Sequence, residues 1–242
     1  MWKSYTSFFV AFTVSTCIAG GQSNAQTLSR ILKNHSEIYD RSPVRGAIES
    51  IYLRGVQQQG ERALELTIHR KRPNSMRYQL GTGEDAVILG YDGEVAWRQT
   101  RIDGEAKVER LGTEAARLLR AEAAFASVLS DDMFEPGQAL DLEGTERVGG
   151  DAAYRIHVSD EADRRSRYYL SSKTYLVLKR EQLDAEGRTI LETLYRDYRA
   201  VGGVPFAHEV ENRVEGERVA LTRFEEIKLN TGVLSFYFEM PD

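Results

Sequence analysis

Four histidines are the first side chains to consider for chemistry, because imidazole can bind a metal ion or move a proton near neutral pH. They are His35, His69, His157 and His208. None stands at metal-ligand spacing to another histidine or to a carboxylate on the same expected element. Alternation with apolar neighbours predicts that His69 and His157 point outward from their strands. His208 shares the parity of its apolar neighbours, so we interpret it as a hydrogen-bonded core histidine rather than a ligand.

Other catalytic signals are absent from the sequence. It contains no G-x-S-x-G, no phosphate-binding glycine-rich loop and no H-E-x-x-H. Three acidic groups fall in expected turns or among other charges, where a solvated surface is the default. These groups are Asp131-Asp132, Asp160-Glu161-Asp163 and Glu225-Glu226. The sequence therefore predicts a protein that is not an enzyme and that holds no metal or cofactor.

Arg72, in the segment Lys71-Arg72-Pro73-Asn74, has the most informative position of any charged residue. If strand alternation continues from Leu66 and Ile68, Arg72 points to the same apolar face. A guanidinium there needs acceptors, and its planar fork suits the carbonyls that a helix C-terminus leaves free. Alternatively, Pro73 breaks the alternation and Arg72 is an edge residue whose charged end reaches solvent. Both interpretations stay open.

Two segments carry apolar residues at helix spacing, and these are the elements available to cover an apolar sheet. The first ends before Ser42-Pro43, and its stripe is Leu28, Ile31, Leu32, His35 and Ile38. The second begins at Thr113, a possible cap, and is followed by Pro136-Gly137. Its stripe is Ala115, Leu118, Leu119, Phe125, Val128 and Leu129.

Most of the remaining sequence alternates between apolar and polar residues with a period of two, which predicts half-buried antiparallel strands. The expected strands are 64–68, 76–80, 86–91, 94–101, 152–158, 166–171, 175–183, 189–199, 206–214, 218–229 and 234–240. So large a sheet must curl, close or be covered. We expect a mainly β, α+β fold: a curved antiparallel half-barrel of about eleven strands, with two or three helices covering its concave apolar face.

Asp92-Gly93 is the strongest hairpin signal, because a two-residue turn favours residues that tolerate positive φ. It predicts that strands 86–91 and 94–101 are joined by a tight turn. In that register Trp97 pairs with Ile88, and Gly90 lies opposite Val95. The small glycine would then leave a hollow beside Trp97, which suits either a cavity wall or ordinary core packing.

The first 25 residues read as a cleavable secretory signal. Lys3 is their only charge, an apolar run extends from Phe8 to Ile18, and small residues follow at Ser23-Asn24-Ala25. The run is shorter than the roughly 20 residues that span a bilayer. The alternatives are a membrane anchor and lipid attachment at Cys17. Cleavage after Ala25 would remove the only cysteine, and would leave residues 26–242 as one domain.

The net charge of −5 arises from acidic and basic residues that are interleaved along the chain. Nucleic-acid binding requires a concentrated basic face, so we expect no nucleic-acid partner. Small basic clusters occur at 70–72 and 164–167, and the default interpretation of each is a solvated turn or strand edge.

Three short patches together resemble the periplasmic lipoprotein-carrier (LolA-like) family. They are Lys71-Arg72-Pro73-Asn74, Tyr91-Asp92-Gly93-Glu94 followed by Trp97, and Phe236-Tyr237-Phe238-Glu239-Met240-Pro241. The resemblance implies an open barrel whose helices pack into its concave side and whose cavity holds acyl chains. It also implies that Arg72 helps to hold the helical lid closed. Met76 departs from the family, which has an aromatic residue there, although a thioether also fills irregular apolar space.

The resemblance implies a periplasmic, monomeric carrier of lipoprotein or lipid acyl chains, with transfer partners in the inner and outer membranes. Two alternatives stay open: an envelope sensor or interaction module that binds a lipid or a membrane protein, and a scaffold with no ligand. The residues expected to form the acyl cavity and lid are Leu66, Ile68, Arg72, Met76, Tyr78, Ile88, Trp97, Leu118, Leu119, Phe125, Leu129, Tyr154 and Ile156.

Overall fold

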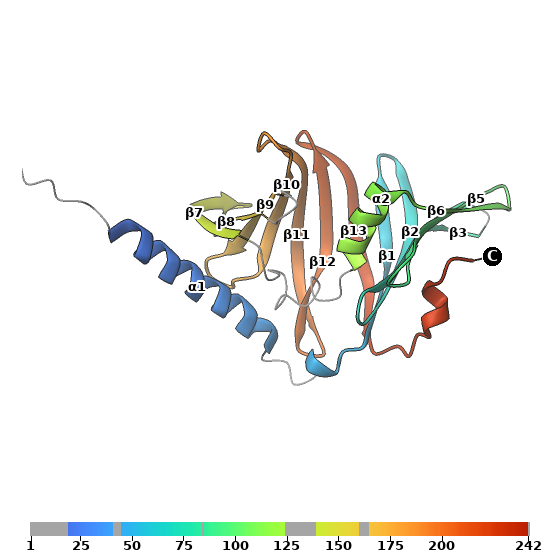
Figure 1. Cartoon of the computed structure of the whole chain (residues 1–242), viewed down its shortest axis with the longest axis horizontal. Helices are drawn as coiled ribbons and strands as arrows, with labels where there is room; N and C mark the ends of the chain where they lie inside the picture. The colour runs from blue at the N-terminus through green and yellow to red at the C-terminus, as the bar shows by residue number, and fades with distance from the viewer. Residues whose placement is uncertain (1–18, 41–44, 84, 124–138, 160–164, 242) are drawn as a thin grey trace, which may run out of the picture.

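The computed structural model describes residues 19–40, 45–83, 85–123, 139–159 and 165–241, which form one broad antiparallel sheet with two α-helices (Figure 1). The helices are α1 (Ala19–Asp40) and α2 (Thr113–Ala123), with short 3-10 helices η1 (Arg45–Ala47) and η2 (Ser235–Phe238). The strands are β1 (Ser50–Gln59), β2 (Arg62–Lys71), β3 (Ser75–Thr82), β4 (Asp85–Tyr91), β5 (Ala96–Ile102), β6 (Glu105–Arg110), β7 (Ala139–Val148), β8 (Asp151–Ser159), β9 (Arg165–Ser171), β10 (Val177–Leu183), β11 (Thr189–Val201), β12 (Val204–Val214) and β13 (Glu217–Leu229).

The sheet is two meanders joined at its centre. Within the described residues its order is β6-β5-β4-β3-β2-β1-β13-β12-β11-β10-β9-β8-β7, so the central pair is β1 with β13. Each meander runs outward by hairpins, the simplest connection between antiparallel strands. β6 and β7 are consequently the two edges, and the sheet is open. The chain crosses from one edge to the other between residues 110 and 139, and α2 lies on this connection.

Alternate residues of each strand face the side of the sheet that carries α1 and α2, which we call the helical face. At one end of this face, Met76 and Tyr91 pack against α2. At the other end, Ile156 and Leu170 pack against Ile31 of α1. The mainly β fold with helices on the apolar face of an antiparallel sheet is therefore confirmed.

The described sheet has thirteen strands rather than the predicted eleven. The prediction missed β1, β6 and β7, and it assigned a strand to 234–240, where the chain forms η2. β6 is an edge strand with largely exposed side chains, so it lacks the apolar alternation that burial of one face imposes. In the other edge strand, β7, only Leu140 and Leu142 alternate with exposed residues. β1 is obscured by its own sequence, because it contains Gly55 and ends in three glutamines.

Gly55 marks a close approach between the two central strands. The register of β1 and β13 shifts between Arg54 and Gly55. A Cβ atom added at Gly55 would lie 2.0 Å from the main-chain oxygen of Arg223. Only glycine allows the two backbones to come this close, which explains why an apolar side chain is missing from the pattern at this position.

The predicted two-residue turn between β4 and β5 is wrong. Tyr91 pairs with Ala96, so the loop spans residues 92–95. The Asp92 carboxylate closes this loop by accepting hydrogen bonds from the main-chain N–H groups of Glu94, at 2.8 Å, and Val95, at 2.7 Å. Because an aspartate side chain can substitute for a main-chain acceptor, the Asp-Gly pair here stabilises a longer loop than a tight turn.

The longer loop changes the partners of Trp97. It lies opposite Gly90, and Ile88 lies opposite Gln99. A Cβ atom added at Gly90 would lie 2.1 Å from Cε2 of the Trp97 indole. The indole therefore covers the glycine backbone, and the hollow predicted beside Trp97 is filled by the ring itself.

Both predicted helices are present. α1 ends at Asp40, before Ser42-Pro43 as predicted, and begins at Ala19. The remainder of the predicted signal segment, including Cys17, lies outside the described residues. Among the described residues, no helix combines the length and the hydrophobicity required to cross a membrane.

Candidate functional site

Two apolar areas of the helical face lie beneath α2 and α1, and a third, around Ile51 and Phe206 with Tyr39 of α1, lies on the central strands. Beneath α2, Leu119 and Ala123 pack against Met76 and Tyr91, with Ile68 beside them. The predicted site residues Ile68, Met76 and Leu119 are therefore brought together. Leu66, also predicted, is buried in the same strand with the parity of Ile68.

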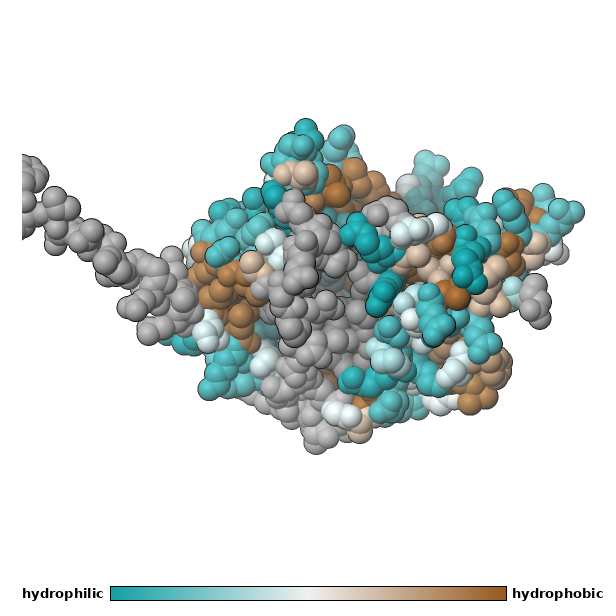
Figure 2. All heavy atoms as spheres, viewed as in Figure 1, coloured by the Kyte–Doolittle hydropathy of each residue, from teal (hydrophilic) through white to brown (hydrophobic). Residues whose placement is uncertain are grey.

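The second apolar area lies beneath α1. The predicted residue Ile156 is fully buried there against Ile31 and Leu170. Tyr154, also predicted, packs against the same cluster and stacks on Tyr175, with ring centroids 6.1 Å apart. Figure 2 likewise shows apolar residues in both the left and the right half of the viewed face.

A polar group lies between the apolar area beneath α2 and the one beneath α1, and we call it the central cluster: Arg70, Glu122, Tyr168, Arg180 and Tyr195. Arg70 donates a hydrogen bond from Nη1 to the main-chain oxygen of Glu122, in the last turn of α2. The Glu122 carboxylate lies 3.7 Å from Nη1 of Arg180. Because Arg70 is on β2 and Arg180 is on β10, the end of α2 contacts both halves of the sheet.

Burial and neighbouring groups shift the pKa values of the two arginines in the central cluster. Burial lowers the pKa of Arg70, and Glu122 and Tyr195 oppose this shift. Burial also lowers the pKa of Arg180, but Tyr168, Tyr195 and Glu122 together outweigh it, so that this pKa is raised. The Arg180 guanidinium lies over the Tyr168 ring, 5.5 Å from its centroid. Both arginines are therefore cationic at neutral pH, on a face that is otherwise largely apolar.

Arg72 is exposed, and it does not lie among the buried residues of the helical face. Its Nε atom donates to the main-chain oxygen of Ile48, just after η1, at 2.7 Å. Its N–H donates to the oxygen of Glu49 at 3.0 Å. In the described part of the chain, the arginine that bonds the end of α2 is Arg70. The prediction that 70–72 is merely a solvated turn is thus wrong for Arg70.

Ile88 and Trp97, both predicted to line the cavity, lie on the opposite face of the sheet from α2. Met76 and Tyr91 pair across β3 and β4 on the helical face, so Ile88 and Gly90 point the other way. Trp97, opposite Gly90, is fully buried, and its Nε1 atom donates to the main-chain oxygen of Phe238 at 2.8 Å. η2 therefore covers this part of the opposite face.

Tyr78 lies on the helical face, as predicted, but it belongs to a small polar chain. Its hydroxyl lies 3.2 Å from Oε1 of Gln57, to which it donates. Gln57 in turn donates from Nε2 to the hydroxyl of Thr222 at 2.9 Å. Burial raises the pKa of Tyr78, which keeps the phenol protonated at neutral pH.

Three predicted residues cannot be placed by side chain. Leu118 lies within α2, but its side chain is outside the described part of the structure, as are Phe125 and Leu129 altogether.

Of the histidines, His208 is buried and hydrogen-bonded to the oxygen of Phe206 at 3.0 Å, which matches the prediction of a core histidine. Among the described residues, no three His, Cys, Asp or Glu side chains converge in a way that could hold a metal ion.

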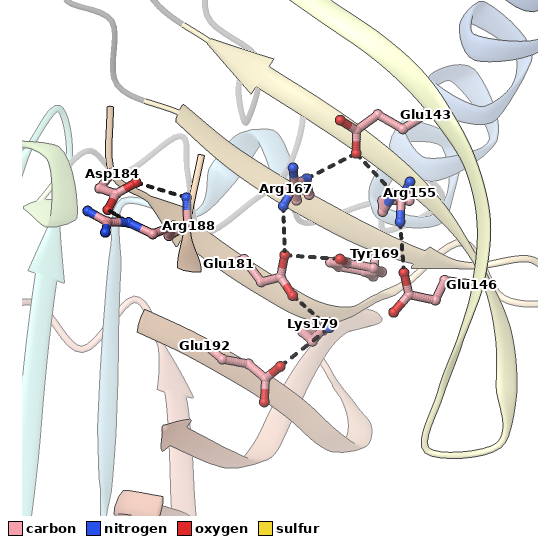
Figure 3. Close-up of polar contacts among 10 residues, drawn as sticks. All are labelled: Glu143, Glu146, Arg155, Arg167, Tyr169, Lys179, Glu181, Asp184, Arg188 and Glu192. Atoms are coloured by element: carbon pink, nitrogen blue, oxygen red, sulfur yellow. Dashed lines mark hydrogen bonds and ion pairs between the residues drawn. The ribbon is translucent and has the colours of Figure 1, made fainter. Parts of the chain in front are cut away.

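On the opposite face, a network of ion pairs crosses β7 to β11 (Figure 3). Glu143 accepts a hydrogen bond from Arg167 at 3.0 Å and forms an ion pair with Arg155, also at 3.0 Å. Lys179 lies 2.8 Å from Glu181 and both are buried, while Tyr169 donates to Glu181 at 3.0 Å. Burial raises the pKa of Tyr169, so this phenol remains a donor. These charges are paired with one another within the sheet, so we assign no binding role to this region of the opposite face.

Sequence reasoning missed the central cluster as a unit. Tyr168 and Tyr195 were recognisable only as sheet aromatics, and Glu122 only as a polar residue of a helix. Arg70 gave a signal, because it has the same parity as Leu66 and Ile68 on an uninterrupted strand. The meeting of β2, β10 and α2 depends on the pairing of β1 with β13, which no local pattern indicates.

No protein-family model matches this sequence, and no curated protein matches it. Solved structures with the same fold include a DUF1329 family protein from Desulfovibrio piger, with 12% identity and a TM-score of 0.59 over 86% of this chain and 97% of that one. A LolA superfamily protein from Nitrosomonas europaea has 13% identity and a TM-score of 0.57, over 89% and 97%. A putative outer membrane lipoprotein-sorting protein domain from Vibrio parahaemolyticus has 11% identity and a TM-score of 0.58, over 87% and 97%. The expected LolA-like fold is therefore confirmed.

Proposed function

We propose that this protein is a non-catalytic carrier that binds the acyl chains of a lipoprotein or lipid on its helical face. The observation that carries the proposal is the cover over this face. α2 is short and rests on apolar residues through Leu119 and Ala123, with Glu122 in contact with two arginines. Such a helix can move aside without disrupting the hydrogen bonds of the sheet.

The energetics suit reversible binding. Each methylene that leaves water contributes about 0.8 kcal/mol, so an acyl chain has a large gross affinity for an apolar surface. In the absence of cargo, Leu119 and Ala123 occupy part of that surface. Cargo must displace them, and the apolar packing that α2 gives up offsets part of the gain. A carrier needs this offset, because it must release what it binds.

The setting of the proposed function is the periplasm. The support is the signal-like segment 1–25 and the fold shared with a lipoprotein-sorting domain. In this proposal residues 26–242 form the mature carrier, a monomer that receives its cargo at the inner membrane and delivers it to the outer membrane. Among the predicted lining residues, Leu66, Ile68, Met76, Leu119, Tyr154 and Ile156 lie on the helical face or on the helix covering it.

Native mass spectrometry of the full chain, produced with its own N-terminal segment in a bacterial periplasm, tests this function. We expect a mass of bound lipid that organic extraction releases and identifies. The purified protein should also take up a neutral fluorescent acyl probe saturably. If no tail-bearing molecule copurifies and the probe does not bind, the carrier function is wrong.

A further inference from the structure

The central cluster contains more positive than negative charge, although it lies between two apolar areas. Among the described residues, Arg70 and Arg180 face one carboxylate, that of Glu122. Burial raises the pKa values of Tyr168 and Tyr195, so both phenols are neutral and can donate hydrogen bonds. A partly buried guanidinium is costly unless acceptors surround it. Within the described residues, the cluster therefore holds two guanidinium groups against one carboxylate.

We propose that the central cluster binds the anionic head of the amphiphile whose hydrocarbon chain lies on the helical face. This inference rests on the proposed carrier function and specifies its ligand class. The shared chemistry is an oxyanion at the end of an alkyl chain, whether a fatty-acid carboxylate or a lipid phosphate. The planar fork of arginine pairs with either group through two parallel hydrogen bonds.

Arg180 is the residue best placed to receive the oxyanion. Its Nε atom is buried and has no hydrogen-bond partner within the described residues. The Glu122 carboxylate is 3.7 Å from its Nη1, beyond the length of a normal charge-assisted hydrogen bond. The Glu122 side chain is 54% exposed. This carboxylate is thus a loosely held counter-ion, which an oxyanion with better geometry can replace.

An amphiphile needs a polar site for its head next to an apolar site for its chain, and the central cluster lies next to such apolar areas. Arg70 pairs with Met76, a residue of the apolar area beneath α2. Arg180 pairs with Tyr168, which packs against the apolar area beneath α1. A head group held at the cluster would leave its chain beside either area, so that head and tail are bound by adjacent parts of one face.

Head-group binding would also release the cover. Glu122 belongs to the last turn of α2, and its main-chain oxygen accepts from Arg70. An oxyanion that competes for Arg70 and Arg180 removes both polar interactions of Glu122. The hydrocarbon chain then displaces the apolar packing of Leu119 and Ala123 at the end of α2. The anionic head therefore favours the uncovered state, and a neutral head does not.

The test compares oleic acid with oleyl alcohol, which have the same chain but differ in head charge. Binding of each is measured by displacement of the neutral probe N-phenyl-1-naphthylamine from the full-length protein, from its Arg180→Gln variant and from its Arg70→Gln variant. We expect the wild type to bind oleate about tenfold more tightly than the alcohol, as a charge-assisted pair allows. Both variants should lose this preference.

Arg196→Gln is the matched control, because Arg196 follows Tyr195 in β11 but pairs with Glu209 and Glu211 on the opposite face. It should retain the preference for oleate. A second pair, dioleoyl phosphatidic acid and dioleoylglycerol, separates phosphate from carboxylate recognition, and preference for either anion supports the proposal. Competition by inorganic phosphate shows that the cluster also accepts the head without its chain.

The possible failures are distinguishable. Equal affinity of the wild type for all anionic and neutral ligands overturns the head-group site but leaves the carrier function intact. If the Arg180→Gln and Arg70→Gln variants still prefer oleate, the head-group site is likewise wrong and the carrier function stands. Absence of binding by every ligand contradicts the carrier function itself. If a variant does not fold, the comparison of ligands on the wild type still decides the question.

Discussion

The guanidinium of Arg70 donates a hydrogen bond to the main-chain oxygen of Glu122, which attaches β2 to the last turn of α2. This hydrogen bond connects a sheet strand to a helix that also rests on the apolar side chains of Met76 and Tyr91. It satisfies one of the carbonyls that a helix C-terminus leaves without an intrahelical partner. The relationship makes Arg70 the residue that sets how firmly α2 covers the helical face.

Arg70→Gln should therefore loosen α2 without unfolding the sheet. A hydrogen bond to a charged group contributes roughly 1.5–3 kcal/mol, so amide exchange in α2 should quicken by about tenfold or more. Hydrogen–deuterium exchange mass spectrometry of the α2 peptides measures this. Arg62→Gln, at the exposed start of the same strand, is the control and should leave exchange unchanged. Equal exchange in the wild type and Arg70→Gln would exclude this role for Arg70.

Gly90→Ala adds only one methyl group but should lower the free energy of unfolding strongly. The added methyl would lie 2.1 Å from the Trp97 ring, so the indole must move out of a buried position. Overpacking of this kind costs typically about 1–3 kcal/mol. Urea unfolding gives the value, with Gly46→Ala as the comparison, because a Cβ there meets nothing within 4 Å. Similar midpoints for the two variants would show that the packing of Trp97 on Gly90 is not tight.

Trp97→Phe should lower stability but leave ligand binding intact. The change deprives the Phe238 carbonyl of its donor, and a buried polar group left unsatisfied costs about 1–3 kcal/mol. Because Trp97 lies on the opposite face from α2, affinity for the neutral fluorescent probe should be unaffected. Paired measurements of unfolding and probe binding separate the two effects. A large loss of affinity at unchanged stability would place Trp97 in the binding site instead.

Glu211 should make the protein less stable in acid. Burial alone would raise the pKa of its carboxyl group, but hydrogen bonds from Arg196 and Arg213 lower it below the usual value. The stabilisation is therefore present above the unfolded-state pKa, about 4.3, and is lost as the pH falls through the lower folded-state pKa. Thermal melting from pH 7 to 3 should show a smaller acid-induced loss for Glu211→Gln than for the wild type. Parallel pH profiles would contradict this assignment.

Features that depend on local periodicity could be predicted from the sequence. Features that depend on how the strands pair across the sheet could not. The stripe through Leu28 and Ile31 identified α1, and the alternation around Ile68 and Tyr78 identified β2 and β3. Edge strands such as β6 have no buried face to impose a pattern. The Asp92 side chain changed the loop length, and this changed the register that placed Trp97 opposite Ile88.

The candidate site was predictable in part for the same reason. Apolar residues such as Met76 and Ile156 could be assigned to an apolar face from their strands alone. The choice between Arg70 and Arg72 depended on where β2 ends, and it ends at Lys71, so alternation does not extend to Arg72. The partnership of Arg180 with Glu122 required knowledge of where α2 crosses the sheet, which is tertiary information.

The location of a bound acyl chain is the central claim, and photo-cross-linking tests it most directly. A fatty acid with a diazirine near the end of its chain is bound to the full-length protein, irradiated, and mapped by tandem mass spectrometry. We predict saturable adducts on helical-face residues around Met76, Leu119 and Ile156, which unlabelled oleate suppresses. Adducts confined to the opposite face around Trp97, or labelling that oleate does not suppress, would contradict the account.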